Sequence, residues 1–413
     1  MRVTPQDLLD CFRFALAEND PAVVTGGHLP ELPRPPFVLA VGKAAPGMAR
    51  AAAERYAGAS GLIVAPRGAA GTSTAFEVLE ASHPTPDESS LRAALAVRAF
   101  VQGLTPDDTL LVLLSGGSSS LLAAPEGVTL AQKRAVTADL LRSGADISTM
   151  NAVRRSLSWL KGGGLLRLTR ARVLTLLFSD VPGDDPAVIG SGPSVPSSST
   201  AEAAIRSLRD LGLAERHPEV VAQLERRAGQ VPAPILARAE PPQVIASGTT
   251  LLASAECFWT ARGWPVLNLG AQLGGEAREL AGFHAALAAS SLDTGRPRAA
   301  PFVLLSGGEA SVTVTGSGRG GRNQEFLLWL LQRSTHPLWA LAVDTDGIDG
   351  NTPAAGAWLS PDTWGRVTPG ELRQHARDND AHALFAGLGQ RVVTGPTGNN
   401  LNDLRVLLVD QGA

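Results

Sequence analysis

The stretch 304–325 combines the features of an anion-binding loop. An apolar run ends at Ser306–Gly308, an alternating Val-Thr segment follows, and a glycine loop then carries Arg319 and Arg322. Glycine lets backbone N–H groups turn toward a ligand, and arginine can donate two parallel hydrogen bonds to phosphate or carboxylate oxygens. A helix is expected to follow, and its N-terminus would add partial positive charge. The stretch therefore predicts a clamp for an anion; the alternative is a flexible hairpin tip with solvated arginines.

Lysine is scarce in this chain, so the positions where it remains are informative. The 36 basic residues include only three lysines, Lys43, Lys133 and Lys161. A compact, rotatable ammonium should persist where a planar guanidinium cannot replace it. Lys43 follows an apolar strand (37–41) and opens an alanine-rich helix, so it should lie at a strand end, where open parallel sheets bind ligands. Lys161 precedes three glycines and is a second candidate, whereas Lys133 lies in a plain helical pattern that predicts an exposed side chain.

The sequence Leu-Leu-Ser-Gly-Gly occurs twice, each time at the end of an apolar strand. The first copy ends the strand 109–114 and the second is the run 304–308. The turn after the first copy contains Ser115, Gly116, Gly117 and Ser118. Two distant strands with the same turn suggest two α/β domains that each offer a glycine-serine edge to one cleft. The alternative is coincidence between common strand-to-turn solutions.

The segment 150–165 is predicted to be a helix that Asn151 could cap. Arg154, Ser158 and Lys161 would then lie on one face, because their spacing follows the helical repeat. Two cations that face one way suit a polyphosphate, whereas a solvated basic face is the alternative.

Carboxylates follow two of the expected strands. They are Asp180 and Asp184 after the strand 173–178, and Asp344, Asp346 and Asp349 after the strand 339–343. A carboxylate at a strand end can hold magnesium or accept a proton from a hydroxyl group, although turn formation alone also favours aspartate. The spacing of the second group does not fit an EF-hand loop, so it predicts metal or substrate contact without naming the metal. His83 precedes a proline and is interpreted as structural, with ligand contact as the alternative.

Composition excludes several classes of protein. A net charge of −3 and a pI near 6.2 give no reason to expect nucleic acid or an anionic membrane as a partner. Cys11 and Cys257 do not form a disulfide framework or a metal-binding pattern. No apolar run approaches the roughly 18 residues of a membrane span, and the charged N-terminus does not predict a signal peptide. We therefore expect a cytoplasmic protein.

The length of 413 residues predicts two domains, with three as the alternative. A proline-rich segment, 229–243, is the expected linker, which gives domains at 1–236 and 237–413. The helix predicted at 5–17 would lie on the surface before the first domain. Strands and helices alternate along the rest of the chain, beginning in the second domain with a strand at 244–246, so the fold class is α/β.

The motifs taken together resemble one family. They are GK at 42–43, LSGGxSSLL, NxVRRxLSxLKGGGL, SDVPGDDPxxIGSGPS, LSGGE, GxGRGGRNQE, TDGIDG and TGPTGNNxND. This set is similar to that of the class II glycerate kinases, the glycerate 2-kinase family with a C-terminal MOFRL domain. The resemblance extends from Lys43 to Asp403.

The resemblance implies a fold, an activity and site residues. The fold would be an N-terminal Rossmann-like parallel sheet plus a C-terminal MOFRL α/β domain, with the active site in the cleft between them. The activity would be ATP- and Mg²⁺-dependent phosphorylation of D-glycerate, usually at the 2-hydroxyl, in a monomer or homodimer. Lys43 and Arg322 would be catalytic cations, and Asp180 would hold metal or accept the hydroxyl proton. Replacing either cation by alanine should lower turnover by orders of magnitude with the fold intact.

The remaining candidate residues extend these assignments. Asp180 and Asp346 are the candidate metal ligands. Candidates for nucleotide or substrate binding are Ser115, Gly116, Gly117, Ser118, Asn151, Arg154, Lys161, Asp184, Gly307, Gly308, Glu309, Arg319 and Asn323.

Two other functions fit parts of the sequence. The run 316–321 satisfies G-x-G-x-x-G, and Asp344 ends the next strand, which is typical of an NAD(P)H-dependent enzyme such as a hydroxypyruvate reductase. The preceding Val-Thr alternation is unlike a buried parallel strand, and two arginines crowd a loop that normally takes small residues. A non-catalytic small-molecule sensor is the third possibility, but the charged residues at strand ends argue against it.

Overall fold

The computed structural model describes residues 3–69, 75–145, 147–230 and 234–410. The chain forms two compact units. The N-terminal unit is Pro21–Ile245, and the C-terminal unit combines Met1–Asp20 with Ala246–Ala413. This division differs from the sequence-based domains at 1–236 and 237–413 at both ends of the first domain. Residues 231–233 of the expected linker lie outside the described residues.

The sheet of the N-terminal unit has the order β3-β2-β1-β4-β5-β6, and every pair along this path is parallel. Its strands are β1 (Phe37–Val41), β2 (Ser60–Pro66), β3 (Glu77–Ala81), β4 (Thr109–Ser115), β5 (Arg172–Phe178) and β6 (Arg238–Ala239). This is the doubly wound order, in which the direction of strand addition across the sheet reverses between β1 and β4, and ligands bind beyond the carboxyl ends of those strands. The predicted Rossmann-like sheet is confirmed.

One further strand corrects a prediction. The strand expected to open the second domain, β7 (Gln243–Ala246), pairs with β5 and so extends the first sheet. The apolar pattern of residues 244–246 correctly predicted a strand. Which sheet the strand joins depends on its pairing with β5, a contact between distant segments that the local pattern does not contain.

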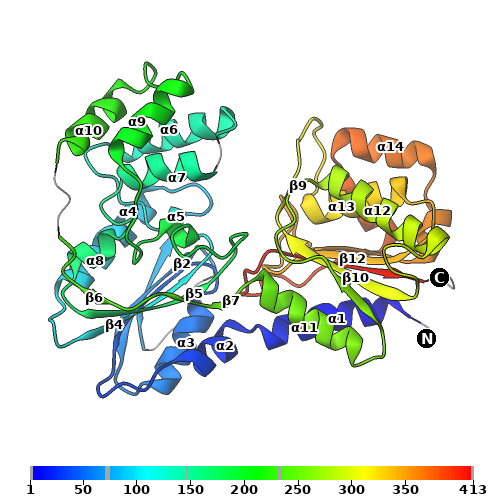
Figure 1. The fold of residues 1–413 in the computed structure, drawn as a ribbon, viewed down its shortest axis with the longest axis horizontal. Coiled ribbons are helices and arrows are strands. Elements are labelled where there is room, and N and C mark those ends of the chain that lie inside the picture. Colours follow the sequence, from blue (N-terminus) through cyan, green and yellow to red (C-terminus); the bar gives the residue numbers. More distant parts are fainter. Residues whose placement is uncertain (1–2, 70–74, 146, 231–233, 411–413) are drawn as a thin grey trace. The chain divides into compact units, whose positions relative to one another are not determined.

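Helices cover both faces of this sheet and also form a separate bundle (Figure 1). The helices on the sheet are α2 (Pro21–His28) and α3 (Ala45–Arg55) on one face, and α4 (Glu88–Gln102), α5 (Ser118–Leu121) and α8 (Gly164–Leu168) on the other. The bundle consists of α6 (Leu130–Arg142), α7 (Ile147–Ser156), α9 (Ala201–Asp210) and α10 (Pro218–Ala228). The bundle has its own apolar core, which includes Leu140, Val153, Leu208 and Leu224.

The predicted helix at 150–165 is wrong in extent. Helix α7 ends at Ser156, Ser158 forms a bridge with Pro125, and α8 begins only at Gly164. Asn151 lies inside α7, so it does not cap the helix. The helical spacing of apolar residues continues in the sequence beyond Ser156, but residues 157–163 form a turn in the structure.

The C-terminal unit is a three-layer α/β structure with a mixed sheet of order β14-β13-β12-β15-β10-β8 (Figure 1). The strands are β8 (Val266–Asn268), β10 (Phe302–Gly308), β12 (Trp339–Asp344), β13 (Gly356–Leu359), β14 (Arg391–Val392) and β15 (Asp403–Val409). Only β8 and β10 pair in parallel along this path. A two-stranded pair, β9 (Gly275–Glu276) and β11 (Ala310–Ser311), completes the strands of the described residues.

Each face of this sheet is covered by helices (Figure 1). One face carries α12 (Ala277–Thr294), α13 (Arg322–Arg333), α14 (Pro369–Asp378) and α15 (Ala381–Leu388), and the other carries α1 (Pro5–Glu18) and α11 (Gly248–Thr260). Alternate strand residues face the two layers, so Leu304, Ala342 and Leu407 pack under the first set. None of the helices in the described part of the chain combines the length and apolar character of a membrane span.

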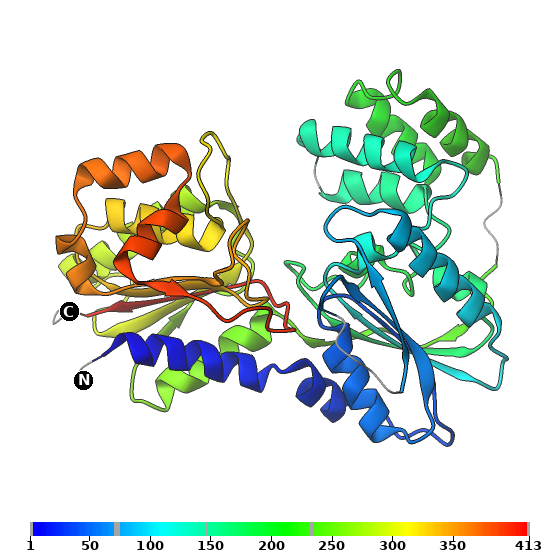
Figure 2. The ribbon, with the colours of Figure 1, turned by 180° about the vertical axis from the view of Figure 1, so that it is seen from behind.

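The first helix corrects another prediction, because α1 belongs to the C-terminal unit (Figure 2). It is the amphipathic surface helix that its spacing predicts, since Leu8 and Phe12 are buried on one face while Arg13 and Glu18 are exposed on the other. At its end Asn19, 2% exposed, donates a hydrogen bond to Ser254 Oγ (3.0 Å) and accepts one from Thr250 Oγ1 (2.7 Å). The amide of Asn399 donates to the Asn19 carbonyl oxygen (2.7 Å). The start of the chain is thereby joined to segments more than 230 residues away.

Candidate functional site

The ends of β1 and β4 bring Lys43 beside the first glycine-serine turn. The Lys43 backbone N–H donates to the Gly116 carbonyl oxygen (2.9 Å), and the Ala44 N–H donates to Ser115 Oγ (3.0 Å). Gly42 has φ +127°, and a Cβ on it would lie 2.1 Å from Ser115 Oγ, so only glycine allows this approach. Lys43 therefore lies at the switch point of the sheet, where the fold places ligands.

A third strand end contributes His83, which follows β3. A Cβ added to Gly117 (φ +84°) would lie 2.9 Å from His83 Cδ2 and 3.6 Å from Lys43 Cγ. The imidazole, the lysine stem and the serine turn therefore surround one small space. The sequence interpretation of His83 as structural did not anticipate this position.

Ser119 is the centre of a cationic cluster in the same unit. Its Oγ accepts hydrogen bonds from Lys161 Nζ (2.6 Å) and Arg154 Nη2 (2.6 Å) and lies 3.0 Å from Ser191 Oγ. Lys161 Nζ also donates to the Ser119 carbonyl oxygen (2.9 Å). Arg154 and Lys161 thus converge as predicted for an anion site, although they do not share a helix face.

Lys133 joins this cluster, so the prediction of an exposed side chain is wrong. It is 8% exposed and its Nζ donates to the Leu157 carbonyl oxygen (2.8 Å), in the turn that follows α7. Burial and the charge of Arg154 lower the pKa of Lys133 to about 7. Burial likewise lowers the pKa of Lys161, and the charges of Arg154 and Lys133 add to that effect. Burial thus disfavours the charged form of both lysines, and a bound anion would stabilise that form.

A cavity of about 470 Å³ opens onto these cations. Lys133, Arg154, Lys161 and Ser119 line one part of it, while Pro84, Leu130 and Met150 supply apolar wall. We name it the Ser119 cavity. An anionic group with a less polar remainder matches this lining.

Asp180 and Asp184 lie in the loop after β5, at the same edge of the sheet. Ser115 pairs with Phe178, so Asp180 is only two residues beyond the partner of the serine turn. Asp184 has φ +53°, and its N–H donates to the Val181 carbonyl oxygen (3.0 Å), which makes a tight turn. Asp180 therefore remains the better-placed candidate of the two.

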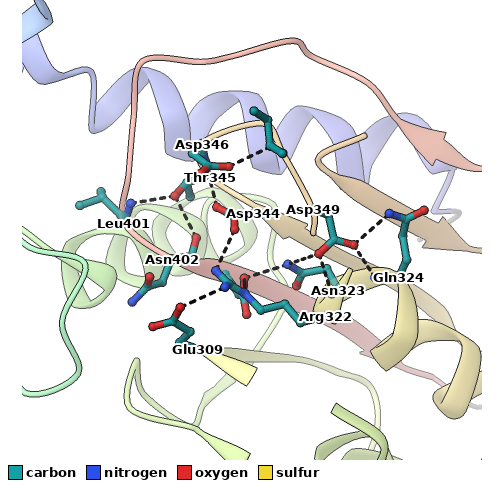
Figure 3. A network of polar contacts seen from close by, with 12 residues as sticks. Glu309, Arg322, Asn323, Gln324, Asp344, Thr345, Asp346, Asp349, Leu401 and Asn402 are labelled. Atoms are coloured by element: carbon teal, nitrogen blue, oxygen red, sulfur yellow. Dashed lines mark hydrogen bonds and ion pairs between the residues drawn. The ribbon is translucent and has the colours of Figure 1, made fainter. Parts of the chain in front are cut away.

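In the C-terminal unit, Arg322 begins α13 and contacts three carboxylates (Figure 3). Its Nε donates to Asp403 Oδ1 (2.8 Å), Nη1 to Glu309 Oε1 (3.0 Å) and Nη2 to Asp344 Oδ2 (2.8 Å). Burial alone would lower the pKa of the guanidinium, but the charges of Asp403, Asp344 and Glu309 outweigh it and raise that pKa. The loop predicted to offer its arginine to an external anion instead binds carboxylates of the protein.

The start of α13 is also satisfied internally. Asp349 Oδ1 accepts the Asn323 N–H (3.0 Å), and Oδ2 accepts the Gln324 N–H (2.9 Å) and its Nε2 (3.0 Å) (Figure 3). A Cβ on Gly321 would lie 2.3 Å from Asp349 Cγ, so glycine is required for this contact. Asp349 is therefore an internal cap of the helix rather than a metal ligand, and it fills the predicted anion position.

Replacement of Asp349 by alanine should lower the free energy of unfolding by about 2–4 kcal/mol, because buried N–H groups of α13 would lose their acceptor. Urea denaturation would measure the change, with Asp362→Ala, an exposed carboxylate, as the control. A change no larger than that of the control would contradict the capping role.

Asp344 and Asp346 supply oxygen ligands suited to magnesium. Burial, followed by the charges of Asp346 and Asp403, raises the pKa of Asp344 well above its ordinary value, so a nearby divalent cation would stabilise its ionised form. Among the described residues no group of three or more His, Cys, Asp and Glu side chains is arranged to hold a metal. Mg²⁺ often binds through one or two carboxylates, waters and substrate phosphates, so this pair fits it.

Glu325 is a buried acid beside this site. It is 2% exposed, accepts a hydrogen bond from Asn379 Nδ2 (3.4 Å), and lines a cavity of about 330 Å³ with Arg322. Burial raises its pKa from 4.5 to about 7. Between pH 4.5 and about pH 7, the folded state keeps the Glu325 proton that the unfolded state has lost. The contribution of this group to the free energy of unfolding therefore falls as pH rises through this range.

The Glu325→Gln variant should therefore gain stability relative to the parent between pH 5 and pH 8, by up to about 3 kcal/mol. Denaturation at both pH values would measure the difference, and Glu54→Gln on an exposed position of α3 is the control. If the free energies of unfolding of the two variants change equally between pH 5 and pH 8, Glu325 is not the source of the pH dependence.

Comparison with known proteins places the chain in a family. Residues 7–225 match a domain of unknown function (DUF4147), and residues 302–403 match the MOFRL family. The D-glycerate 2-kinase of Thermotoga maritima is 36% identical over 382 residues, which cover 90% of each chain. The crystal structure of a glycerate kinase from the same organism superimposes with a TM-score of 0.87 at 34% identity, covering 98% of this chain and 99% of that one.

The chain belongs to the glycerate 2-kinase family with a C-terminal MOFRL domain. A protein of Agrobacterium vitis that carries the name "Putative hydroxypyruvate reductase" is 43% identical over 419 residues, covering 98% of this chain and 94% of that one. The relatives of this chain therefore carry two different names, glycerate 2-kinase and "Putative hydroxypyruvate reductase".

The glycine loop of this family member does not have the geometry of a dinucleotide site. Strand β11 ends at Ser311, and residues 312–321 form no strand, so the loop does not follow a strand directly as that motif requires. The loop packs on the end of α14 and the start of α15, where Gly318 N–H donates to the Asp378 carbonyl oxygen (2.8 Å) and Arg319 N–H to Asp380 Oδ1 (3.0 Å). The first-turn amides of α13, which would face a pyrophosphate, are held by Asp349.

The second glycine-serine turn has an internal role as well. Ser306 Oγ in β10 lies 2.8 Å from Nε2 of His284, which is on helix α12, and Gly307 N–H donates to the Gly270 carbonyl oxygen (3.0 Å). Gly308 has φ +113° and leads to Glu309, which contacts Arg322. The shared sequence thus positions different partners in the two units.

Sequence reasoning missed two residues at the carboxylate cluster. Asp403 bridges Arg322 and Arg405, whose Nη2 donates to Asp403 Oδ2 (2.5 Å), and it also accepts from Asn323 Nδ2 (2.8 Å). Arg405 is fully buried. A single arginine in the apolar run 404–409 was the signal that could have identified it, because a buried charge needs a partner.

Proposed function

We propose that this protein transfers the γ-phosphoryl group of ATP to D-glycerate in a Mg²⁺-dependent reaction, most directly at the 2-hydroxyl to give 2-phosphoglycerate. Family membership makes it an enzyme of the kinase class, and the relatives named glycerate kinase supply the substrate. The observation that carries the proposal is the convergence of Lys43, the serine turn and the buried cations at the switch point of a doubly wound sheet.

Phosphoryl transfer demands mainly positioning and stabilisation of charge. Lys43 would offset charge on the transferred phosphoryl oxygens, since it lies at the strand end with Gly117 and His83 beside it. Arg154 and Lys161 would seat the carboxylate of glycerate or the distal phosphates. Asp180 would accept the proton of the reacting hydroxyl group or bind metal.

The candidates for magnesium are Asp346, with Asp344 beside it, in the C-terminal unit and Asp180 in the N-terminal unit. Bound Mg²⁺ would neutralise charge on the phosphates of ATP. Arg322 would hold Asp344 and Glu309 in position while keeping its own charge.

The compartment and assembly are part of the same proposal. Both cysteines are free, which agrees with a reducing compartment, and we place the reaction in the cytoplasm. We expect a monomer or homodimer that needs no nucleic acid or membrane partner.

The deciding experiment measures ADP release from Mg-ATP when D-glycerate is added to the purified protein, with phosphorus NMR to identify the product. L-glycerate and protein without substrate are the controls. A 2-phosphoglycerate signal supports the proposal, and a 3-phosphoglycerate signal would overturn only the choice of hydroxyl. No ADP release together with oxidation of NAD(P)H by hydroxypyruvate would favour the reductase function instead.

A further inference from the structure

A second cavity of about 650 Å³ lies in the N-terminal unit on the other side of Lys161. Lys161 lines both this cavity and the Ser119 cavity, but the other cations differ. Arg154 lines the Ser119 cavity, whereas its neighbour Arg155 lines the second one. Consecutive residues of a helix point about 100° apart, so α7 can supply one arginine to each cavity.

The charged lining of the second cavity is predominantly positive. Its cations are Lys161, Arg155, Arg167 and Arg227, and its carboxylates are Glu126 and Glu202. Arg227 forms an ion pair with Glu126, which leaves the other cations in excess over Glu202. The lining therefore favours a ligand with more than one negative charge.

Arg155 is oriented by neutral oxygens of the serine-rich segment. Its Nη2 donates to the Ala187 carbonyl oxygen (2.5 Å), and its Nη1 donates to Ser199 Oγ (3.3 Å) and Ser197 Oγ (3.5 Å). Its Nε is buried and makes no hydrogen bond. Burial lowers the pKa of Arg155, with the charge of Asp185 opposing that effect. Its guanidinium thus retains capacity for an anionic partner.

Two further features add donors for anionic oxygens to the same cavity. The hydroxyl groups of residues 197–200 line one wall. Arg167 donates to the Gly162 carbonyl oxygen (3.4 Å). A Cβ added to Gly162 would lie 2.9 Å from Ser197 Cβ, so this glycine turn packs closely on the serine-rich segment. Arginine and hydroxyl donors together are typical of phosphate recognition.

We propose that this cavity is a second anion site that binds a phosphate-bearing small molecule through Arg155, Arg167 and the 197–200 hydroxyl groups. The ligand is either the phosphate chain of a nucleotide or a separate phosphorylated metabolite, and the shared chemistry is a phosphate dianion or polyanion. The site is defined by binding alone, so it does not depend on the kinase proposal.

The test measures binding of inorganic pyrophosphate to the full chain by isothermal titration calorimetry at low salt. The variants are Arg155→Gln, Arg167→Gln and Ser198→Glu, which places a carboxylate in the exposed part of the hydroxyl segment. The matched control is Arg170→Gln, an exposed arginine near α8 that does not line the cavity. Loss of one charged hydrogen-bond donor should weaken binding at this site roughly 10- to 100-fold.

Competition then distinguishes the two sources of phosphate. If ATP displaces pyrophosphate from the site that Arg167→Gln weakens, the cavity holds part of the nucleotide. If pyrophosphate stays bound there at saturating ATP and 2-phosphoglycerate displaces it, the ligand is a phosphorylated metabolite. Pyrophosphate affinity and stoichiometry in all three variants equal to those of Arg170→Gln would overturn the proposal, whether or not the protein turns over glycerate.

Discussion

The Lys43→Met variant is expected to lose about 10²- to 10³-fold in turnover with little change in stability. Methionine keeps most of the length of the side chain and removes only the ammonium. The hydrogen bonds that build the turn come from the backbone of Lys43 and Ala44, so the substitution leaves them in place. Steady-state kinetics with ATP and D-glycerate, together with urea denaturation, would measure both quantities.

The control for this experiment is Arg50→Met, which removes a positive charge from an exposed position of the following helix α3. Turnover of the Lys43 variant within a few-fold of this control would exclude Lys43 as the group that stabilises the transferred phosphoryl. A large loss of stability would instead show that the ammonium supports the turn.

The Arg322→Met variant is expected to lose both activity and stability. The substitution leaves Asp344, Asp403 and Glu309 close together without their shared cation, and breaking such a buried ion pair costs about 3–5 kcal/mol. The structure therefore changes the expectation from sequence that the fold would stay intact. Loss of turnover in this variant alone cannot separate catalysis from folding.

A second substitution makes that separation. In Arg322→Met with Asp344→Asn, one of the opposed carboxylates becomes neutral, and the amide oxygen of the substituted side chain can still accept the Asp346 N–H. The double variant should recover part of the unfolding free energy but stay far below the turnover of Asp344→Asn alone, which measures how much turnover is lost when Asp344, itself a candidate magnesium ligand, is replaced. Recovery of turnover with stability would show that Arg322 acts only by holding the carboxylates.

The strands of both sheets could be predicted because their apolar runs are local signals. The strand at 37–41 and the turn carrying Lys43 were identified in this way, and so was the Leu-Leu-Ser-Gly-Gly turn after β4. Strand order was implied by the family resemblance rather than by the pattern of any one strand.

The errors have a common physical origin in contacts between distant segments. Lys133 lies on a helix whose pattern suggested exposure, but the turn at Leu157 covers it. The end of α7 is set by the bridge between Ser158 and Pro125, which helical periodicity does not contain. The partners of Arg322 come from three separate positions along the chain, so its spacing within the glycine loop could not identify them.

The position of α1 has a consequence for how the chain is made. The N-terminal unit is an insertion within the C-terminal one, because α1 and Asn19 pack with residues that follow Ala246. During synthesis at about 5–20 residues per second, α1 waits on the order of tens of seconds before α11 leaves the ribosome. The apolar face of α1 has no native partner in that interval, whereas the inserted unit can already fold. The C-terminal unit is thus the first to be started and the last to be completed.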